Sequence, residues 1–171
     1  MTAANVGALL GRIGTGLFQQ AWVMGDLREA RTAMRRTLGC GEFVEIRTGD
    51  LPYDLRGSRV SCDLSLAFAR SGNVQIELVQ PLRGEGIHCE FLAQRGPGAH
   101  HLGFLVADLD ATVSAAASDG FACVMAGDLG PVRISYLDTF DALGVYVELL
   151  EDPDGMLMAT MPWRDDEAAS S

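Results

Sequence analysis

Two glutamates in this sequence lie in the middle of apolar runs, where a charged side chain is unexpected. Glu77 stands in "VQIELVQ" and Glu148 in "VYVELLE". A buried carboxylate must take up a proton or meet a cation, because burying it alone is costly. A strand with one solvent-facing side would instead point the glutamate at water. That explanation is sufficient for one glutamate, but two at equivalent places in a repeated pattern favour a shared cation site.

The repeated pattern is a strand, a turn and a helix, present over residues 18–43 and again over residues 100–124. In each copy an aspartate stands where a helix N-cap belongs and a glycine where a left-handed C-terminal residue belongs: Asp26 and Gly39, then Asp108 and Gly120. Further strand material follows each helix. The chain is therefore expected to be a β-α-β-β(-β) unit written twice, as in a duplicated domain.

Counting back from the two N-cap aspartates aligns the start of each first strand. His101 lies seven residues before Asp108, and Gln19 lies seven residues before Asp26. Each repeat thus offers a metal-capable polar residue in its first strand and a glutamate in its last. The repeat predicts that Gln19, His101 and the two glutamates are related in pairs by a pseudo-twofold axis.

The second repeat begins with two adjacent histidines, in a chain that has only three. Neighbours in a strand face opposite sides of the sheet, so His100 and His101 are not expected to reach one site together. The alignment selects His101. His100 is expected to point the other way and to make a structural or supporting hydrogen bond. Replacing His101 with alanine should then abolish metal binding, whereas replacing His100 should largely spare it.

Composition restricts the class of protein. Apolar residues make up 48% and charged residues 21% of the 171 residues, as in ordinary globular proteins. The net charge of −10 argues against a nucleic-acid partner, which needs a basic surface. No apolar run reaches the roughly 18 residues of a membrane span, and no signal peptide is evident, so we expect a cytoplasmic protein without a membrane partner.

The reactive residue types are equally restrictive. All 13 basic residues are arginine, which excludes Schiff-base chemistry and a lysine general base. The four cysteines form no CxxC pair and are expected to be reduced thiols in the core. The expected organisation is an N-terminal extension (1–17), a first module (18–81), a linker (82–99), a second module (100–152) and a C-terminal tail (153–171).

The motifs "QQAWVMGDLREA", "IELVQP", "FLAQRGPGAHHLGF" and "YLDTFDALGVYVELLE" resemble those of the vicinal oxygen chelate superfamily. That superfamily includes glyoxalase I, methylmalonyl-CoA epimerase, extradiol dioxygenases and bleomycin-resistance proteins. The resemblance implies an α+β fold in which two paired βαβββ modules form a half-open barrel around a cleft. It also implies a homodimer and a metal site whose ligands come from the first and last strands of each module: Gln19, Glu77, His101 and Glu148.

One imidazole, one amide oxygen and two carboxylates suit a divalent ion such as Zn, Ni, Co or Mn. Such an ion can polarise a carbonyl, and a carboxylate beside it can then remove the α-proton. The resemblance implies that Glu148 is the main base and that Glu77 is a ligand and possible second base. The expected activity is that of an isomerase, epimerase or lyase acting on a small molecule, like glyoxalase or methylmalonyl-CoA epimerase.

Two alternatives remain open. An extradiol Fe(II) dioxygenase needs two histidines and one carboxylate, and Gln19 takes the place of one histidine. A metal-free binding module on the same fold is the second alternative, because fold does not settle function. The aromatic content of 7% favours the enzyme over a binding cleft lined by stacking rings. The acidic net charge does not favour a polyanionic substrate, unless a local arginine patch holds it: Arg47, Arg56, Arg59 and Arg133 are the candidates.

Overall fold

The computed structural model of this chain describes residues 3–14 and 16–155, which form an eight-stranded barrel with five helices. The strands are β1 (Leu17–Val23), β2 (Val44–Leu55), β3 (Ser58–Ser71), β4 (Val74–Gly84), β5 (Gly98–Leu105), β6 (Cys123–Asp128), β7 (Arg133–Leu137) and β8 (Tyr146–Glu151). The helices are α1 (Ala3–Ile13), α2 (Leu27–Leu38), α3 (Ile87–Arg95), α4 (Leu109–Ser118) and α5 (Phe140–Leu143).

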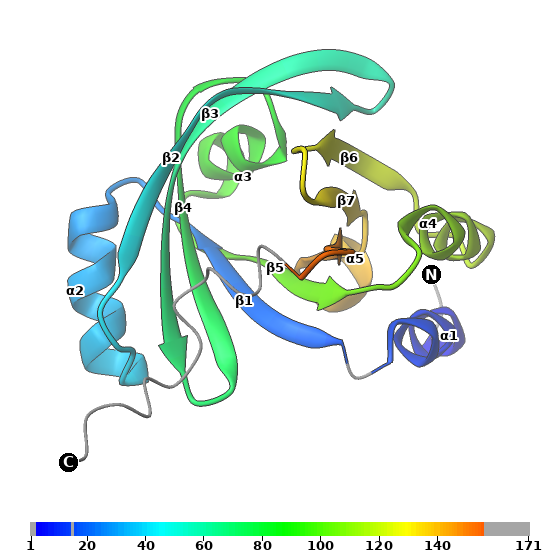
Figure 1. Ribbon diagram of the computed structural model, residues 1–171, viewed down its shortest axis with the longest axis horizontal. Helices are drawn as coiled ribbons and strands as arrows, with labels where there is room; N and C mark the ends of the chain where they lie inside the picture. The colour runs from blue at the N-terminus through cyan, green and yellow to red at the C-terminus, as the bar shows by residue number, and fades with distance from the viewer. Residues whose placement is uncertain (1–2, 15, 156–171) are drawn as a thin grey trace.

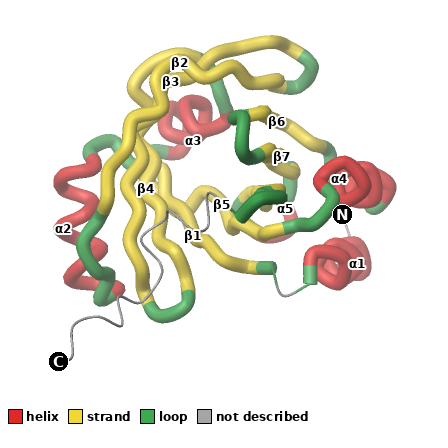
Figure 2. The backbone as a smooth tube through the Cα atoms, viewed as in Figure 1, coloured by secondary structure: helices red, strands yellow, loops and turns green. Residues whose placement is uncertain are grey.

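The barrel consists of two copies of one βαβββ module, as the repeat predicts. The strand order around the ring is β1-β4-β3-β2-β6-β7-β8-β5. Figures 1 and 2 show this ring with α2 on one outer side and α4 on the other. The modules meet at an antiparallel pairing of β1 with β5 and at a short pairing of β2 with β6. The second contact joins Asp54 to Ala126 and Leu55 to Met125, and it closes the ring of the expected half-open barrel.

Both predicted helix boundaries are confirmed by their caps. The Asp26 carboxylate accepts a hydrogen bond from the backbone N–H of Glu29 at 3.1 Å, and Asp108 accepts one from Ala111 at 2.9 Å. These bonds satisfy backbone donors that have no partner within the helix. Gly39 ends α2 at φ 62°, a left-handed conformation that strains any residue with a Cβ. The capping pattern therefore sets where each first strand must end.

The region expected to be a linker contains helix α3. Its Ile87 and Phe91 are buried in the core cluster inside the barrel, one helical turn apart. Figure 2 shows α3 within the outline of the ring when the barrel is viewed end-on. The helix α3 also contacts β1, β4 and β5, so it packs beside the place where the two modules meet.

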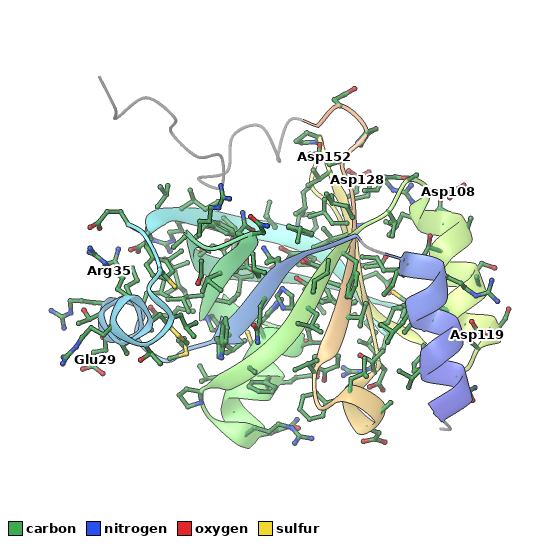
Figure 3. All side chains as sticks on the ribbon, turned by 90° about the horizontal axis from the view of Figure 1, so that it is seen from below. Glu29, Arg35, Asp108, Asp119, Asp128 and Asp152 are labelled. Atoms are coloured by element: carbon green, nitrogen blue, oxygen red, sulfur yellow. The ribbon has the colours of Figure 1, made fainter. Side chains whose placement is uncertain are left out.

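The N-terminal helix α1 packs against α4 on the outside of the second module (Figure 3). Leu9 is fully buried there, in a cluster with Phe104, Phe121 and other apolar residues. An ion pair lies beside this apolar contact: the Arg12 guanidinium is 2.9 Å from the carboxylate of Asp119. Thus α1 extends the core of the second module, although it lies outside both repeats.

Within residues 3–14 and 16–155, no helix combines the length and hydrophobicity that crossing a membrane requires. Most of the expected C-terminal tail, residues 156–171, lies outside the described residues.

The packing of α1 gives a stability prediction. Leu9→Ala should lower the free energy of unfolding by about 2–5 kcal/mol, because it leaves a cavity in a fully buried cluster. The matched control is Leu10→Ala on the same helix, where the leucine is 41% exposed. It should change stability by at most about 0.5 kcal/mol. Urea denaturation followed by circular dichroism measures both, and equal effects would contradict the packing of α1.

Candidate metal centre

The structure brings all four predicted residues together inside the barrel. Gln19, Glu77, His101 and Glu148 come from β1, β4, β5 and β8, and each is at most 6% exposed. The Nε2 atom of His101 lies 3.1 Å from Glu77 Oε2, 3.2 Å from Gln19 Oε1 and 3.4 Å from Glu148 Oε2. Neither glutamate points to solvent, so the solvent-facing alternative for these strands is wrong.

Strand register accounts for this convergence. Where β1 and β5 pair, Gln19 lies opposite Gly103 and His101 lies opposite Ala21, so the pairing is symmetric about its centre. Each first strand also runs parallel to the last strand of its own module. Gln19 lies beside Gln75 and His101 beside Tyr146, in both cases two residues before the glutamate. The predicted pseudo-twofold relation is therefore present in the hydrogen-bond register.

Small residues opposite the site make room for it. A Cβ atom at Gly103 would lie 2.9 Å from Oε1 of Gln19 and 3.0 Å from its Cβ, which is too close for a side chain. The amide of Gln19 donates through Nε2 to Oε1 of Gln75 at 2.6 Å. This bond fixes the amide orientation and leaves the Gln19 oxygen facing His101.

His100 does not point away from the site, so that prediction is wrong. Trp22 of β1 pairs with Ala99 while Ala21 pairs with His101, which leaves His100 as the extra residue of a β-bulge. A bulge re-aims side chains that regular alternation would send to opposite faces. His100 and His101 consequently lie on one side, with their Nδ1 atoms 2.9 Å apart. The pseudo-twofold partner of this bulge is at Phe18, which also faces the cavity.

The predicted supporting hydrogen bond of His100 is present, and its partner is His101 itself. Burial holds the pKa of His100 well below its usual range, so this ring is neutral. A neutral His100 can accept the Nδ1–H of His101, which leaves Nε2 of His101 directed at the three oxygens. This is the tautomer that a metal-ligating histidine needs.

The charges at the centre are strongly coupled. Burial lowers the pKa of His101, but the charges and hydrogen bonds of Glu148 and Glu77 more than offset it and raise the pKa to about 9. Burial raises the pKa of Glu77, and His101 opposes that shift. Burial, and then the charges of Glu148 and Glu77, also raise the pKa of Tyr136, which hydrogen-bonds Glu148. Without a metal, His101 is thus the cation that the two carboxylates share.

A divalent cation fits this donor set better than a proton does. When both are ionised, the two buried carboxylates carry two negative charges, whereas a protonated imidazole supplies one positive charge. A divalent ion would balance both carboxylates and let His101 remain neutral. The amide oxygen of Gln19 adds a fourth donor to the set.

A second group of nitrogens fits a metal less well. His88, His100 and His101 also bring their ring nitrogens within 4.8 Å of one another. The rings of His88 and His100 are stacked, with centroids 4.6 Å apart and planes 27° apart. Stacked rings direct their in-plane lone pairs side by side and not toward one point. His88 and His100 are therefore better explained as neutral rings packed behind His101.

A cavity of about 270 Å³ opens beside the four residues inside the barrel. Gln19, Glu77 and Glu148 contribute to its wall. The rest of the wall is mostly apolar and includes Phe18, Leu51, Leu64, Phe68, Val79 and Leu150. A larger surface groove of about 560 Å³, between the end of β2 and α4, contains none of the four. The cavity can therefore hold a small, largely apolar molecule against the carboxylates.

Sequence reasoning missed three residues around the centre. His88 lies on α3 and lines the cavity, Tyr136 lies on β7 against Glu148, and Gln75 orients Gln19. The helix that carries His88 could have been predicted, because Gly86 and Gly96 bracket a segment whose apolar residues recur at helical spacing. The positions of Tyr136 and Gln75 could not have been predicted, since their contacts with Glu148 and Gln19 depend on which strands become neighbours.

Comparison with known proteins agrees with this architecture. The sequence profile of the Glyoxalase/Bleomycin resistance protein/Dioxygenase superfamily matches residues 18–136. The uncharacterized protein YqjC of Bacillus subtilis (strain 168) is 29% identical over 92 residues, which are 52% of this chain. The match spans 65% of the length of YqjC.

Several solved structures share the fold. Methylmalonyl-CoA epimerase from Mycobacterium tuberculosis is 29% identical, with a TM-score of 0.63 over 86% of this chain and 93% of its own. A variant of Streptomyces coelicolor methylmalonyl-CoA epimerase in complex with 2-nitronate-propionyl-CoA is 24% identical, with a TM-score of 0.55 over 81% and 97%. A 4-hydroxymandelate synthase variant from the same organism is 18% identical, with a TM-score of 0.54 over 79% and 48%. The last two show likeness of fold alone.

The electrostatics of the centre give a titration prediction. In metal-free protein one histidine, His101, should titrate with a midpoint near 9, while His88, whose pKa burial lowers to about 3, should stay neutral. Because the folded pKa exceeds the ordinary 6.5, the stabilisation is complete below about pH 6.5 and is lost as pH rises through 9. NMR titration of the imidazole nitrogens measures this, and Glu148→Gln should lower the midpoint. Three ordinary midpoints would contradict the arrangement.

Proposed function

Because the chain belongs to the Glyoxalase/Bleomycin resistance protein/Dioxygenase superfamily, we propose that it is a metal-dependent isomerase or epimerase. It would move the proton α to a carbonyl of a small, largely apolar substrate. One observation carries the proposal: two buried carboxylates and an imidazole converge, with an amide oxygen, beside an apolar cavity. A lyase of the glyoxalase type uses the same first step and falls within the proposal.

Gln19, Glu77, His101 and Glu148 would hold the divalent ion, with Zn, Ni, Co and Mn as the candidates. When bound, the ion would supply an electrophile that polarises the substrate carbonyl and stabilises negative charge on its oxygen. The protein contributes a dry wall around this position, because all four residues are at most 6% exposed. His100 keeps the Nε2 atom of His101 available to the ion through its own hydrogen bond.

Glu148 is proposed as the main base, and Glu77 as a ligand and second base. The two glutamates approach His101 from β8 and β4, which are related by the pseudo-twofold axis. A substrate between them would present opposite faces of its α-carbon, as an epimerisation requires. Burial raises the pKa of Glu77, which favours a carboxyl that can carry and return a proton. Tyr136 distinguishes the two, because its hydroxyl group bonds Glu148.

The arginines favour a substrate whose reacting part is held by the cavity and not by a cationic patch. Arg47 pairs with Asp63, and Arg56 pairs with Glu90. Arg133 bridges two further acidic side chains, Asp110 and Glu151. Of the four candidate arginines, only Arg59 makes no ion pair with the described residues. An acyl thioester remains the first substrate class to test because the Mycobacterium tuberculosis relative is a methylmalonyl-CoA epimerase. The homodimer and the cytoplasmic location stay predictions.

Elemental analysis and proton exchange test the proposal together. Protein purified without chelator should carry about one divalent transition metal per chain. The loaded protein should exchange the α-proton of an acyl thioester, hydroxy-ketone or hemithioacetal with deuterium from solvent, as followed by NMR. Failure to bind any of the four ions, even after soaking, would contradict the proposal and favour a metal-free binding module.

Glu148→Gln should reduce α-proton exchange by about 10²–10⁴-fold, because it removes the proposed base while keeping the shape of the side chain. The matched control is Glu151→Gln on the same strand. Glu151 bonds Arg133 and the backbone of Leu109 and lies outside the cavity wall. Exchange by this control should stay within about threefold of the unchanged protein. Equal losses in both variants would rule out Glu148 as the base.

The histidine pair gives a prediction about metal affinity. His101→Ala should abolish binding, because it removes the only nitrogen of the proposed set. The sequence-based expectation that replacing His100 spares binding is revised, because the bulge turns His100 toward His101: His100→Ala should weaken binding by about 10–100-fold, since it removes the partner that orients His101. Isothermal titration with Zn²⁺ or Ni²⁺ measures both affinities. Unchanged affinity in His100→Ala would show that the hydrogen bond between the two rings does not support the metal.

A further inference from the structure

Two of the four cysteines lie side by side although they are far apart in sequence. The Sγ atoms of Cys62 on β3 and Cys89 on α3 are 3.7 Å apart. A disulfide bond needs about 2.05 Å, so the sulfurs must approach by about 1.7 Å, the difference between the two distances. Cys62 is fully buried, whereas Cys89 is partly exposed. Cys89 is therefore the cysteine of the pair that is nearer to solvent, and the sulfur of Cys62 lies beside its own.

The two thiols differ in pKa, as a disulfide-forming pair requires: one must be a thiolate that attacks the oxidant, and the other must be a thiol that attacks afterwards. A hydrogen bond from Cys62, opposed by burial, lowers the pKa of Cys89 to about 7. Cys89 also lies in the first turn of α3, where the positive end of the helix dipole stabilises a thiolate. The same hydrogen bond, together with burial, raises the pKa of Cys62. Cys89 is thus the nucleophile and Cys62 the thiol that responds to it.

The other two cysteines differ from this pair. Burial raises the pKa of both Cys40 and Cys123. Cys123 directs its thiol at the backbone oxygen of Met125, at 3.5 Å. Among the described residues, neither has another thiol in hydrogen-bond contact. They provide internal controls for the pair.

We propose that Cys62 and Cys89 form a redox couple that a hydroperoxide converts into an intramolecular disulfide. The Cys89 thiolate attacks one peroxide oxygen, the O–O bond breaks, and the departing oxygen takes up a proton as water or an alcohol. Cys89 is then a sulfenic acid. The sulfur of Cys62 loses its proton and attacks Cys89, the S–O bond breaks, and water leaves. Two thiols are oxidised and one hydroperoxide is reduced; a dithiol reductant reverses the change.

A disulfide between Cys62 and Cys89 would form next to a residue of the cavity wall, so oxidation could affect the cavity. Cys89 directly follows His88, which lines the cavity and stacks on His100. A disulfide would tether this first turn of α3 to β3. On the next residue, Glu90 already pairs with Arg56 at 2.9 Å, so oxidation would add a covalent link where an ion pair exists.

Treatment of the full chain with hydrogen peroxide tests the couple. Peptide mapping by mass spectrometry should show one cross-linked peptide containing Cys62 and Cys89, with the loss of two hydrogen masses, and dithiothreitol should restore the original mass. The double variant Cys40→Ser/Cys123→Ser should behave identically. In Cys62→Ser, oxidation should stop at the sulfenic acid of Cys89, which dimedone would trap. Cys89→Ser should form neither the sulfenic acid nor the disulfide.

Alkylation rates provide a measurement that does not depend on any variant. At neutral pH, iodoacetamide should modify Cys89 about tenfold faster than Cys40 or Cys123, since Cys89 has the larger thiolate fraction. Equal rates for all three, a disulfide involving Cys40 or Cys123, or a bond only between chains would each overturn the proposal. Metal content and α-proton exchange play no part in this readout, so its failure is distinguishable from that of the proposed function.

Discussion

The burial of two carboxylates beside one imidazole is the interaction on which the rest of the site depends. Glu77 and Glu148 are buried inside the barrel with His101 within 3.4 Å of both, so the imidazole can offset their charge. Without the imidazole, the two carboxylates would have to take up a proton or bind another cation, or remain as uncompensated buried charge at a cost of about 3–5 kcal/mol. All four residues of the centre are at most 6% exposed, and such burial strengthens the electrostatic interactions among them. The centre is therefore both the most costly part of the core and the part suited to chemistry.

Duplication gives the site its symmetry, and small departures from symmetry make its two halves chemically different. The pairing of β1 with β5 relates Gln19 to His101 and one β-bulge to the other. The equivalent positions carry an amide in one half and an imidazole in the other, so only one half has a titratable first-strand residue. Behind His101 lies the ring of His100, whereas the equivalent bulge carries Phe18. The two glutamates consequently meet different neighbours although the backbone around them is alike.

No arginine among the described residues lines the cavity. The acidic chain uses its arginines in local ion pairs, such as Arg47 with Asp63 and Arg56 with Glu90. The first pair joins neighbouring strands and involves the buried carboxylate of Asp63, whereas the second joins a strand turn to α3 and is partly exposed, so it contributes little to stability. Under the proposed function, recognition inside the cavity would depend on shape, apolar contact and the polar residues of its wall, among them Gln19, Glu77 and Glu148. The net charge of −10 includes the two glutamates of the centre, and the other acidic and arginine residues that the structure describes lie outside the cavity wall.

The sequence by itself determined the two modules, the caps at Asp26 and Asp108, and the four residues of the centre, because periodicity and a repeated spacing are local properties that survive folding. It could not show that His100 joins His101, since a β-bulge is a property of strand pairing and alternation predicts the opposite. It also could not place α3 and His88 inside the barrel, because the local sequence of a short helix does not determine which part of the fold the helix packs against. The tertiary structure decided these points through register and packing, which act between residues distant in the chain.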